Sequence, residues 1–121
     1  MVYLPNEILG YIFDLRSDAM RNDLLFKYTG KHNVNDVNWN YVSKCKTLSE
    51  IFIREFKKRV DWDCISRCQK LSEEFIREFK DHINWYYISI HQTLSEDFIR
   101  EFRDLVNWDC ISRYQKLSED F

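Results

Sequence analysis

The sequence is poor in the residues that make tight turns, with only Gly 2 and Pro 1 among 121 residues. An all-β protein of this size would need more of them, so the shortage favours helices joined by short polar connections. The chain also lacks an excess of charge of one sign, because its formal net charge is -2. This balance does not favour nucleic acid or an anionic lipid surface as a partner.

Long apolar runs are also missing. No run approaches the roughly 18 residues of a membrane span, and Pro5, Asn6 and Glu7 interrupt the apolar start where a signal peptide would need continuity. We therefore expect no membrane partner and an intracellular location, in the cytoplasm or the nucleus. In such a reducing compartment the four cysteines are expected to be thiols.

The sequence does contain a tandem repeat of 23 residues. Tryptophan, leucine and serine each recur at this spacing, at Trp39, Trp62, Trp85 and Trp108, at Leu48, Leu71, Leu94 and Leu117, and at Ser49, Ser72, Ser95 and Ser118. Segments 61–75 and 107–121 are identical at 12 of 15 positions. The units are therefore 38–60, 61–83, 84–106 and a partial 107–121. A period of this length is typical of supersecondary units that stack on one another.

Each unit is expected to form two short helices. The first should begin at an Asn or Asp that accepts a hydrogen bond from the first turn, at Asn38, Asp61, Asn84 and Asn107. The second should begin at the repeated serine, followed by an acid that complements the positive end of the helix. The sequence thus predicts an all-α fold, with a solenoid of short-helix αα-hairpins over residues 37–121 and an N-terminal helical cap over residues 1–36.

Stacking is needed because one hairpin cannot bury its own aromatic residues. We expect the Trp and Phe residues of successive units to form continuous ladders between helices packed about 8–10 Å apart. Trp62→Ala is then expected to cost roughly 3–5 kcal/mol. On the exposed side, Glu and Arg four residues apart, as in Glu50–Arg54, Glu73–Arg77 and Glu96–Arg100, are expected to pair within each second helix.

The N-terminal segment does not follow the repeat. An apolar stripe over Ile8, Leu9, Ile12 and Phe13 predicts a first helix beginning near Pro5. Apolar residues 24–28 predict a second helix that ends near Gly30. Residues 32–36 are expected to form a loop.

The words Leu4-Pro5-Asn6-Glu7-Ile8-Leu9 and Ile12-Phe13-Asp14-Leu15 resemble the opening of an F-box. In that family the opening docks on the adaptor subunit of a cullin-type ubiquitin ligase, and downstream repeats hold the substrate. The resemblance implies that Leu4, Pro5, Ile8, Leu9, Ile12 and Phe13 bind such an adaptor, with a plain N-terminal cap as the alternative. The repeats themselves are similar to short tandem repeats in proteins of large DNA viruses, especially giant viruses of amoebae. That similarity implies a viral protein acting inside a host cell, but no particular activity.

The sequence predicts no site for catalysis, metal binding or nucleic-acid binding. Stacking would place Cys45, Cys68 and His91 in a column, but Tyr114 takes the same place in the last unit and paired Cys-x-x-Cys ligands are absent. The acidic turns after the repeated serines are better explained by helix capping than by acid–base catalysis. We therefore expect no enzyme activity, no catalytic residue, no cofactor and no metal. The basic cluster at residues 57–59 is diluted in later units, so no basic stripe is expected along the array.

Three functional hypotheses remain. The first is a protein–protein interaction module acting as a ubiquitin-ligase substrate adaptor, with Tyr86 and Ile90 as contact residues because they lie at positions that differ between units. The second is a self-assembling structural protein. It would form homo-oligomers through a C-terminal unit whose apolar residues are expected to face water, namely Trp108, Ile111, Leu117 and Phe121. The third is a shortened member of a longer repeat family without activity of its own.

Overall fold

The computed structural model describes the backbone of residues 6–119 and 121, and the side chains from residue 18 onward except residue 120. Within these residues the protein is helical, with eight α-helices, one short 3-10 helix and no strand. The expected all-α helical-repeat fold is therefore confirmed. The chain divides into two compact units, residues 1–38 and 39–121, which are described separately.

The N-terminal unit contains one long helix, α1 (Asn6–Thr29), followed by a 3-10 helix at Val34–Asp36. The expectation of two helices before Gly30 is wrong. No proline or glycine lies between residues 11 and 29, so nothing in the intervening polar stretch interrupts the helix. As expected, α1 ends at Gly30, whose φ of 71° suits a glycine and whose N–H donates to the Phe26 carbonyl at 2.8 Å.

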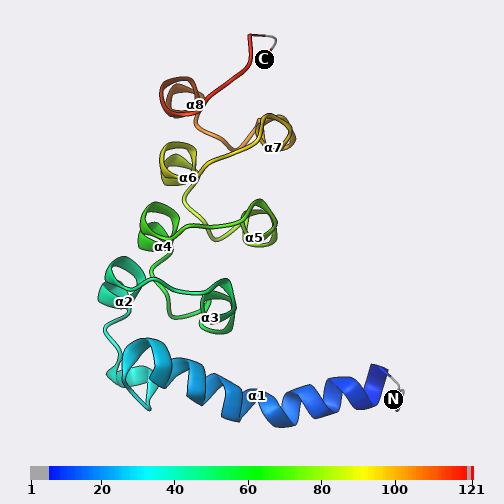
Figure 1. Cartoon of the computed structure of the whole chain (residues 1–121), viewed down its shortest axis with the longest axis vertical. Helices are drawn as coiled ribbons and strands as arrows, with labels where there is room; N and C mark the ends of the chain where they lie inside the picture. The colour runs from blue at the N-terminus through cyan, green and yellow to red at the C-terminus, as the bar shows by residue number, and fades with distance from the viewer. Residues whose placement is uncertain (1–5, 120) are drawn as a thin grey trace. The chain divides into compact units, whose positions relative to one another are not determined.

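The second unit is an array of short helices in two rows (Figure 1). One row holds the first helix of each repeat, α2 (Trp39–Cys45), α4 (Trp62–Cys68), α6 (Trp85–His91) and α8 (Trp108–Tyr114). The other row holds the second helices, α3 (Glu50–Glu55), α5 (Glu73–Glu78) and α7 (Glu96–Glu101). Neighbouring first helices pack against each other, α2 on α4, α4 on α6 and α6 on α8.

The helix starts follow from the repeated capping residues. Ser72 accepts the N–H of Phe75 at the start of α5, and Ser49 and Ser95 do the same for α3 and α7. At the first helices the side chains of Asp61, Asn84 and Asn107 each accept an N–H three residues on. Both sets of expected N-caps are thereby confirmed at these positions. Such caps matter because helices this short have little internal stability of their own.

The core lies between the two rows and repeats in each unit. The aromatic part around Trp62 is a cluster with Phe75 and Phe79 of the same unit, at ring-centroid distances of 6.3 and 5.2 Å. Trp62 is only half-buried, and its indole N–H donates to the Lys57 carbonyl at 2.9 Å. Among the described residues, the ring contacts of Trp62 and Trp85 all lie within their own units, so the expected continuous ladder is wrong there. Between units, the Arg54 guanidinium lies over the Phe75 ring of the next unit, 5.6 Å from its centroid.

Candidate functional site: the stacking contacts and the outer face of the first helices

Buried glutamines bind each unit to the one before it. Gln92 follows α6 and donates from Nε2 to the carbonyls of Ser66 at 3.0 Å and Gln69 at 2.6 Å, while its Oε1 accepts the Leu71 N–H at 3.0 Å. Gln69 and Gln115 make the same three bonds one unit earlier and one unit later. This role was not predicted, although the Gln recurs every 23 residues along the array.

Buried serines of the first helices form a second set of bonds between units. The Ser66 hydroxyl is fully buried, donates to the Trp62 carbonyl at 2.7 Å and accepts the Asn84 N–H of the next unit at 2.9 Å. Ser43 and Ser89 accept the equivalent N–H groups. This bond satisfies a backbone group at the start of the following helix, where the helix itself supplies no partner.

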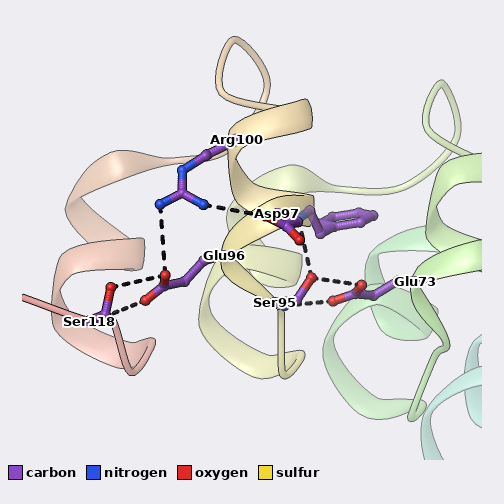
Figure 2. Close-up of polar contacts among 7 residues, drawn as sticks. Glu73, Ser95, Glu96, Asp97, Arg100 and Ser118 are labelled. Carbon is purple, nitrogen blue, oxygen red and sulfur yellow. Dashed lines mark hydrogen bonds and ion pairs between the residues drawn. The ribbon is translucent and has the colours of Figure 1, made fainter. Parts of the chain in front are cut away.

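The capping serines of the second helices are held by glutamates of the preceding unit (Figure 2). Glu73 accepts both the N–H and the hydroxyl of Ser95, at 2.6 and 2.9 Å. Glu96 accepts the same two groups of Ser118, and the Ser118 N–H followed by its hydroxyl holds the pKa of Glu96 below its ordinary value. The recurrent acidic residue therefore links units as well as complementing its own helix dipole.

The arginines of the second helices pair between units, which corrects the expected pairing within α3 and α5. Arg54 binds both carboxylate oxygens of Glu78, and Arg77 binds Glu101 in the same way, at 2.8–3.0 Å. These arginine hydrogen bonds hold the pKa of Glu78 and of Glu101 below the ordinary value. The expected pairs fail because the glutamates four residues earlier bind the next serine instead.

Arg100 differs from the other two arginines of this row. Its guanidinium lies 3.8 Å from Glu96 and 3.3 Å from Asp97, both on its own helix (Figure 2). The expected Glu96–Arg100 pair is therefore confirmed. Arg77 pairs instead with Glu101 on the following second helix, whereas no second helix is described after the α7 helix that carries Arg100.

One side of the first helices makes few of the hydrogen bonds between units, and its exceptions are Asn40 and Asp63. We call it the outer face and define it by the second, sixth and seventh residues of each first helix. Because the Ile or Val and the Ser of α2, α4 and α6 are buried, the second, sixth and seventh positions point outward. All are exposed except Ile90, which is half-buried. They are Asn40, Lys44 and Cys45; Asp63, Arg67 and Cys68; Tyr86, Ile90 and His91; and Asp109, Arg113 and Tyr114.

No two units carry the same three outer-face residues, although the second and fourth units share Asp and Arg at the first two positions. Tyr86 is 51% exposed, lies one helical turn before Ile90 on α6 and contacts the Tyr87 ring at a centroid distance of 5.4 Å. The structure thus brings the two predicted contact residues, Tyr86 and Ile90, onto one surface. Tyr114, 58% exposed, is a second exposed aromatic residue of this face that was not predicted as a contact.

Amide–carboxylate pairs join the first three units along the starts of their first helices. The Asn40 amide donates to the Asp61 carboxylate at 2.9 Å, and this bond, followed by the Cys64 N–H, lowers the pKa of Asp61. One unit on, the Asn84 amide donates to Asp63, also at 2.9 Å. Tyr86 cannot supply such a group toward the fourth unit, so the outer face is chemically different there.

The other predicted site residues are those expected to dock an adaptor and those expected to mediate self-assembly. Leu4 and Pro5 lie outside the described residues, and the residues at positions 8, 9, 12 and 13 belong to α1, with side chains that also lie outside. The expectation that Ile111 faces water is wrong, since it is fully buried on the inward side of α8. Trp108 is 45% exposed and contacts the Phe121 ring at 6.0 Å, while Leu117 and Phe121 are half-buried.

The expected column of Cys45, Cys68 and His91 does not form a recognisable metal site. Cys68 and His91 line a shared groove of about 360 Å³ between the second and third units, together with Arg67 and Lys70. Among the described residues, no group of three His, Cys, Asp or Glu side chains is placed to hold a metal ion. Cys64 lies behind the outer face, where burial raises the pKa of its thiol.

No family model, no curated protein and no solved structure matches the chain. In the part of the chain that the structure describes, none of the helices is both long enough and apolar enough to cross a lipid bilayer.

Proposed function

We propose that the array is a protein-binding module whose contact surface is the outer face. The support is that the residues of the stacking contacts and the residues of the outer face are largely different. The repeated residues make the stacking contacts, and every buried side-chain nitrogen or oxygen in the described part of the chain has a hydrogen-bond partner. The outer face makes few of these contacts, differs between units and exposes Tyr86 and Tyr114, and aromatic residues of this kind are common anchors at protein interfaces.

A binding role accounts for the acidic turns better than a chemical step does. The carboxylates of Glu73 and Glu96 are each held by two donors of the next unit's serine. A general acid or base must be within reach of a substrate proton, and these oxygens are already occupied by structural donors. The proposal therefore assigns no catalytic residue.

Peptide display tests this proposal directly. A random peptide library would be selected against the array, and the selected peptides would then be measured against two double variants. Binding should be lost with Tyr86→Ala/Ile90→Ala and retained with Ile51→Ala/Glu74→Ala, which changes two exposed residues of the second-helix row. Selected peptides that ignore the first variant, or that are lost equally with both, would contradict the outer face as the contact surface.

The F-box-like opening extends this proposal to a ubiquitin-ligase substrate adaptor. In that role the start of the chain docks on the ligase adaptor subunit while the array holds a substrate. The supporting observation is the pair of sequence words at residues 4–9 and 12–15. Size-exclusion chromatography with light scattering, with purified ligase adaptor added, should show an equimolar complex that Ile8→Asp/Leu9→Asp abolishes. An unchanged elution of both proteins would contradict the adaptor role and leave the array proposal standing.

The same light-scattering experiment tests self-assembly, which the 45% exposure of Trp108 favours as a second candidate. Self-assembly predicts a mass that rises with protein concentration and returns to that of one chain in Trp108→Ala. A constant mass over the whole concentration range would contradict it.

A further inference from the structure

A row of basic residues lies at the C-terminal ends of the first helices. We call it the basic edge and define it by Lys44, Lys46, Arg67, Lys70, Arg113 and Lys116, all of them exposed. No acidic residue occurs in the corresponding segments 44–47, 67–70, 90–93 and 113–116. The stacking repeats with the same hydrogen bonds at each junction, so equivalent positions of successive units form rows. Exposed Lys or Arg residues therefore line this edge in the first, second and fourth units.

The cations of the basic edge have no carboxylate partner. Among the described residues, every ion pair involves Arg54, Arg77 or Arg100 of the second-helix row. Arg67, by contrast, contacts the Cys64 sulfur at 3.9 Å and lies over the Tyr87 ring at 5.4 Å. A row of like charges without counter-charges does not stabilise a fold, because the charges repel one another.

Helix dipoles explain only part of this arrangement. Lys44, Arg67 and Arg113 lie in the last turn of their helices, where a cation interacts favourably with the negative helix end. Lys70 and Lys116, however, lie beyond the helix ends, in the connections to the second helices. Their charge therefore remains available to an anionic partner.

The basic edge is interrupted at the third unit. Ile90 and Thr93 stand where the second unit has Arg67 and Lys70, and the exposed Tyr86 lies one turn before Ile90. Along the array the surface is thus basic, basic, apolar and basic. A uniformly charged chain would meet an apolar gap at the third unit, whereas a chain with an apolar side chain among acidic ones would match every unit.

Acidic residues next to the edge also discriminate between anionic partners. Each second helix starts a few residues after the basic edge, and Glu74 and Asp97 are exposed there. Their charge opposes a long polyanion such as single-stranded nucleic acid, which needs a continuous positive groove. A short acidic polypeptide can place its carboxylates on the cations alone, for example in the groove lined by Arg67, Lys70 and His91.

We infer that the basic edge, together with Ile90 and Tyr86, binds an extended acidic polypeptide segment that carries an apolar side chain among its acidic ones. This inference rests on the proposed protein-binding function and specifies the partner's chemistry. The spacing is compatible, because helices pack about 8–10 Å apart and a chain in the polyproline II conformation advances about 3.1 Å per residue with three residues per turn. One partner side chain in every three would therefore face each successive unit.

A labelled peptide of about ten residues provides the probe. It carries Glu at its first, fourth and tenth positions, Leu at its seventh and Ser or Gly elsewhere, and the reversed sequence serves for the opposite chain direction. Fluorescence anisotropy should show binding by one of the two peptides, weakened by salt as expected for charge pairs. Replacing the peptide's Leu by Glu should weaken binding even though it adds negative charge.

Two charge-reversal variants locate the site on the protein. Arg67→Glu/Lys70→Glu should weaken peptide binding by about tenfold or more, and Lys57→Glu/Lys58→Glu, an equal charge change at exposed residues outside the basic edge, should leave it nearly unchanged. Equal losses in both variants would overturn the inference. So would tighter binding when the Leu is replaced, or the absence of binding by either peptide.

A labelled thymidine oligonucleotide distinguishes nucleic acid from polypeptide. The inference would be overturned in favour of nucleic acid if the oligonucleotide bound more tightly than the peptide and if this binding were lost in Arg67→Glu/Lys70→Glu.

The display experiment distinguishes failure of this inference from failure of the proposed protein-binding function. Selected peptides that require Tyr86 and Ile90 but are not acidic would overturn this inference while leaving the protein-binding function intact.

Discussion

The two rows of helices in the array solve different problems. The second-helix row is nearly the same in every unit, and Arg54 and Arg77 each bind a glutamate of the next unit. The first-helix row keeps its inward residues constant but varies its outer ones, and the cations of the basic edge bind no carboxylate. The difference teaches that repetition marks contacts between units, whereas most positions that depart from it are exposed and form the surface that we propose for a partner.

The largest expected effect concerns the aromatic core. Phe75→Ala should lower the free energy of unfolding by about 3–5 kcal/mol, because the ring is 1% exposed and its loss leaves a cavity. Trp62→Ala should cost less than Phe75→Ala because the indole is only half-buried. Urea unfolding followed by circular dichroism measures both, with the exposed Glu74→Ala as control. A Phe75→Ala protein as stable as this control would contradict the stacked core.

The next effect distinguishes the junctions between units. Gln92→Ala should lower the free energy of unfolding by roughly 2–4 kcal/mol, because the Leu71 N–H and two carbonyls lose a buried partner. Gln115→Ala removes the same bonds at the last junction, where the glutamine is only half-buried, and should cost less. In a one-dimensional array an inner junction couples more units than an outer one. Equal costs for the two variants would contradict this account.

A smaller effect is expected at the buried serines. Ser66→Ala should cost about 1–2 kcal/mol because it leaves the Asn84 N–H without its acceptor. Ser112→Ala is the matched control, since the Ser112 hydroxyl is exposed and donates to the Asp109 carbonyl on its own helix. Thermal unfolding of the two variants side by side should show a lower midpoint for Ser66→Ala alone.

The smallest effect compares a paired arginine with an unpaired one. Arg77 lowers the pKa of Glu101 from its ordinary 4.5, so the folded state binds fewer protons than the unfolded state below that pH. The stability from this pair is complete above 4.5 and is lost as the pH falls through the lowered folded value. Arg77→Gln should therefore be less stable than the parent at neutral pH and converge with it in acid. Arg67→Gln should show no such convergence when unfolding is followed from neutral pH to about pH 2.

Local residue patterns were sufficient for part of the fold. The 23-residue period can be read directly from the sequence. The capping Ser, Asn and Asp residues and Gly30 act on backbone groups a few residues away, so their roles could be predicted correctly. The two apolar stripes did not predict a single α1, because the residues between them are mostly polar but contain no Pro or Gly that would interrupt a helix.

The sequence by itself determined that the protein is an all-α repeat, where its units begin and which residues cap its helices. Only the tertiary structure decided that Gln92 and Ser66 tie units together, that Arg77 binds Glu101 rather than Glu73, and that Ile111 is buried. It also decided that the cations of the basic edge lie in rows without carboxylates. The reason is distance along the chain: these contacts join residues 18–26 apart, and their partners are chosen by how the units stack rather than by local preference.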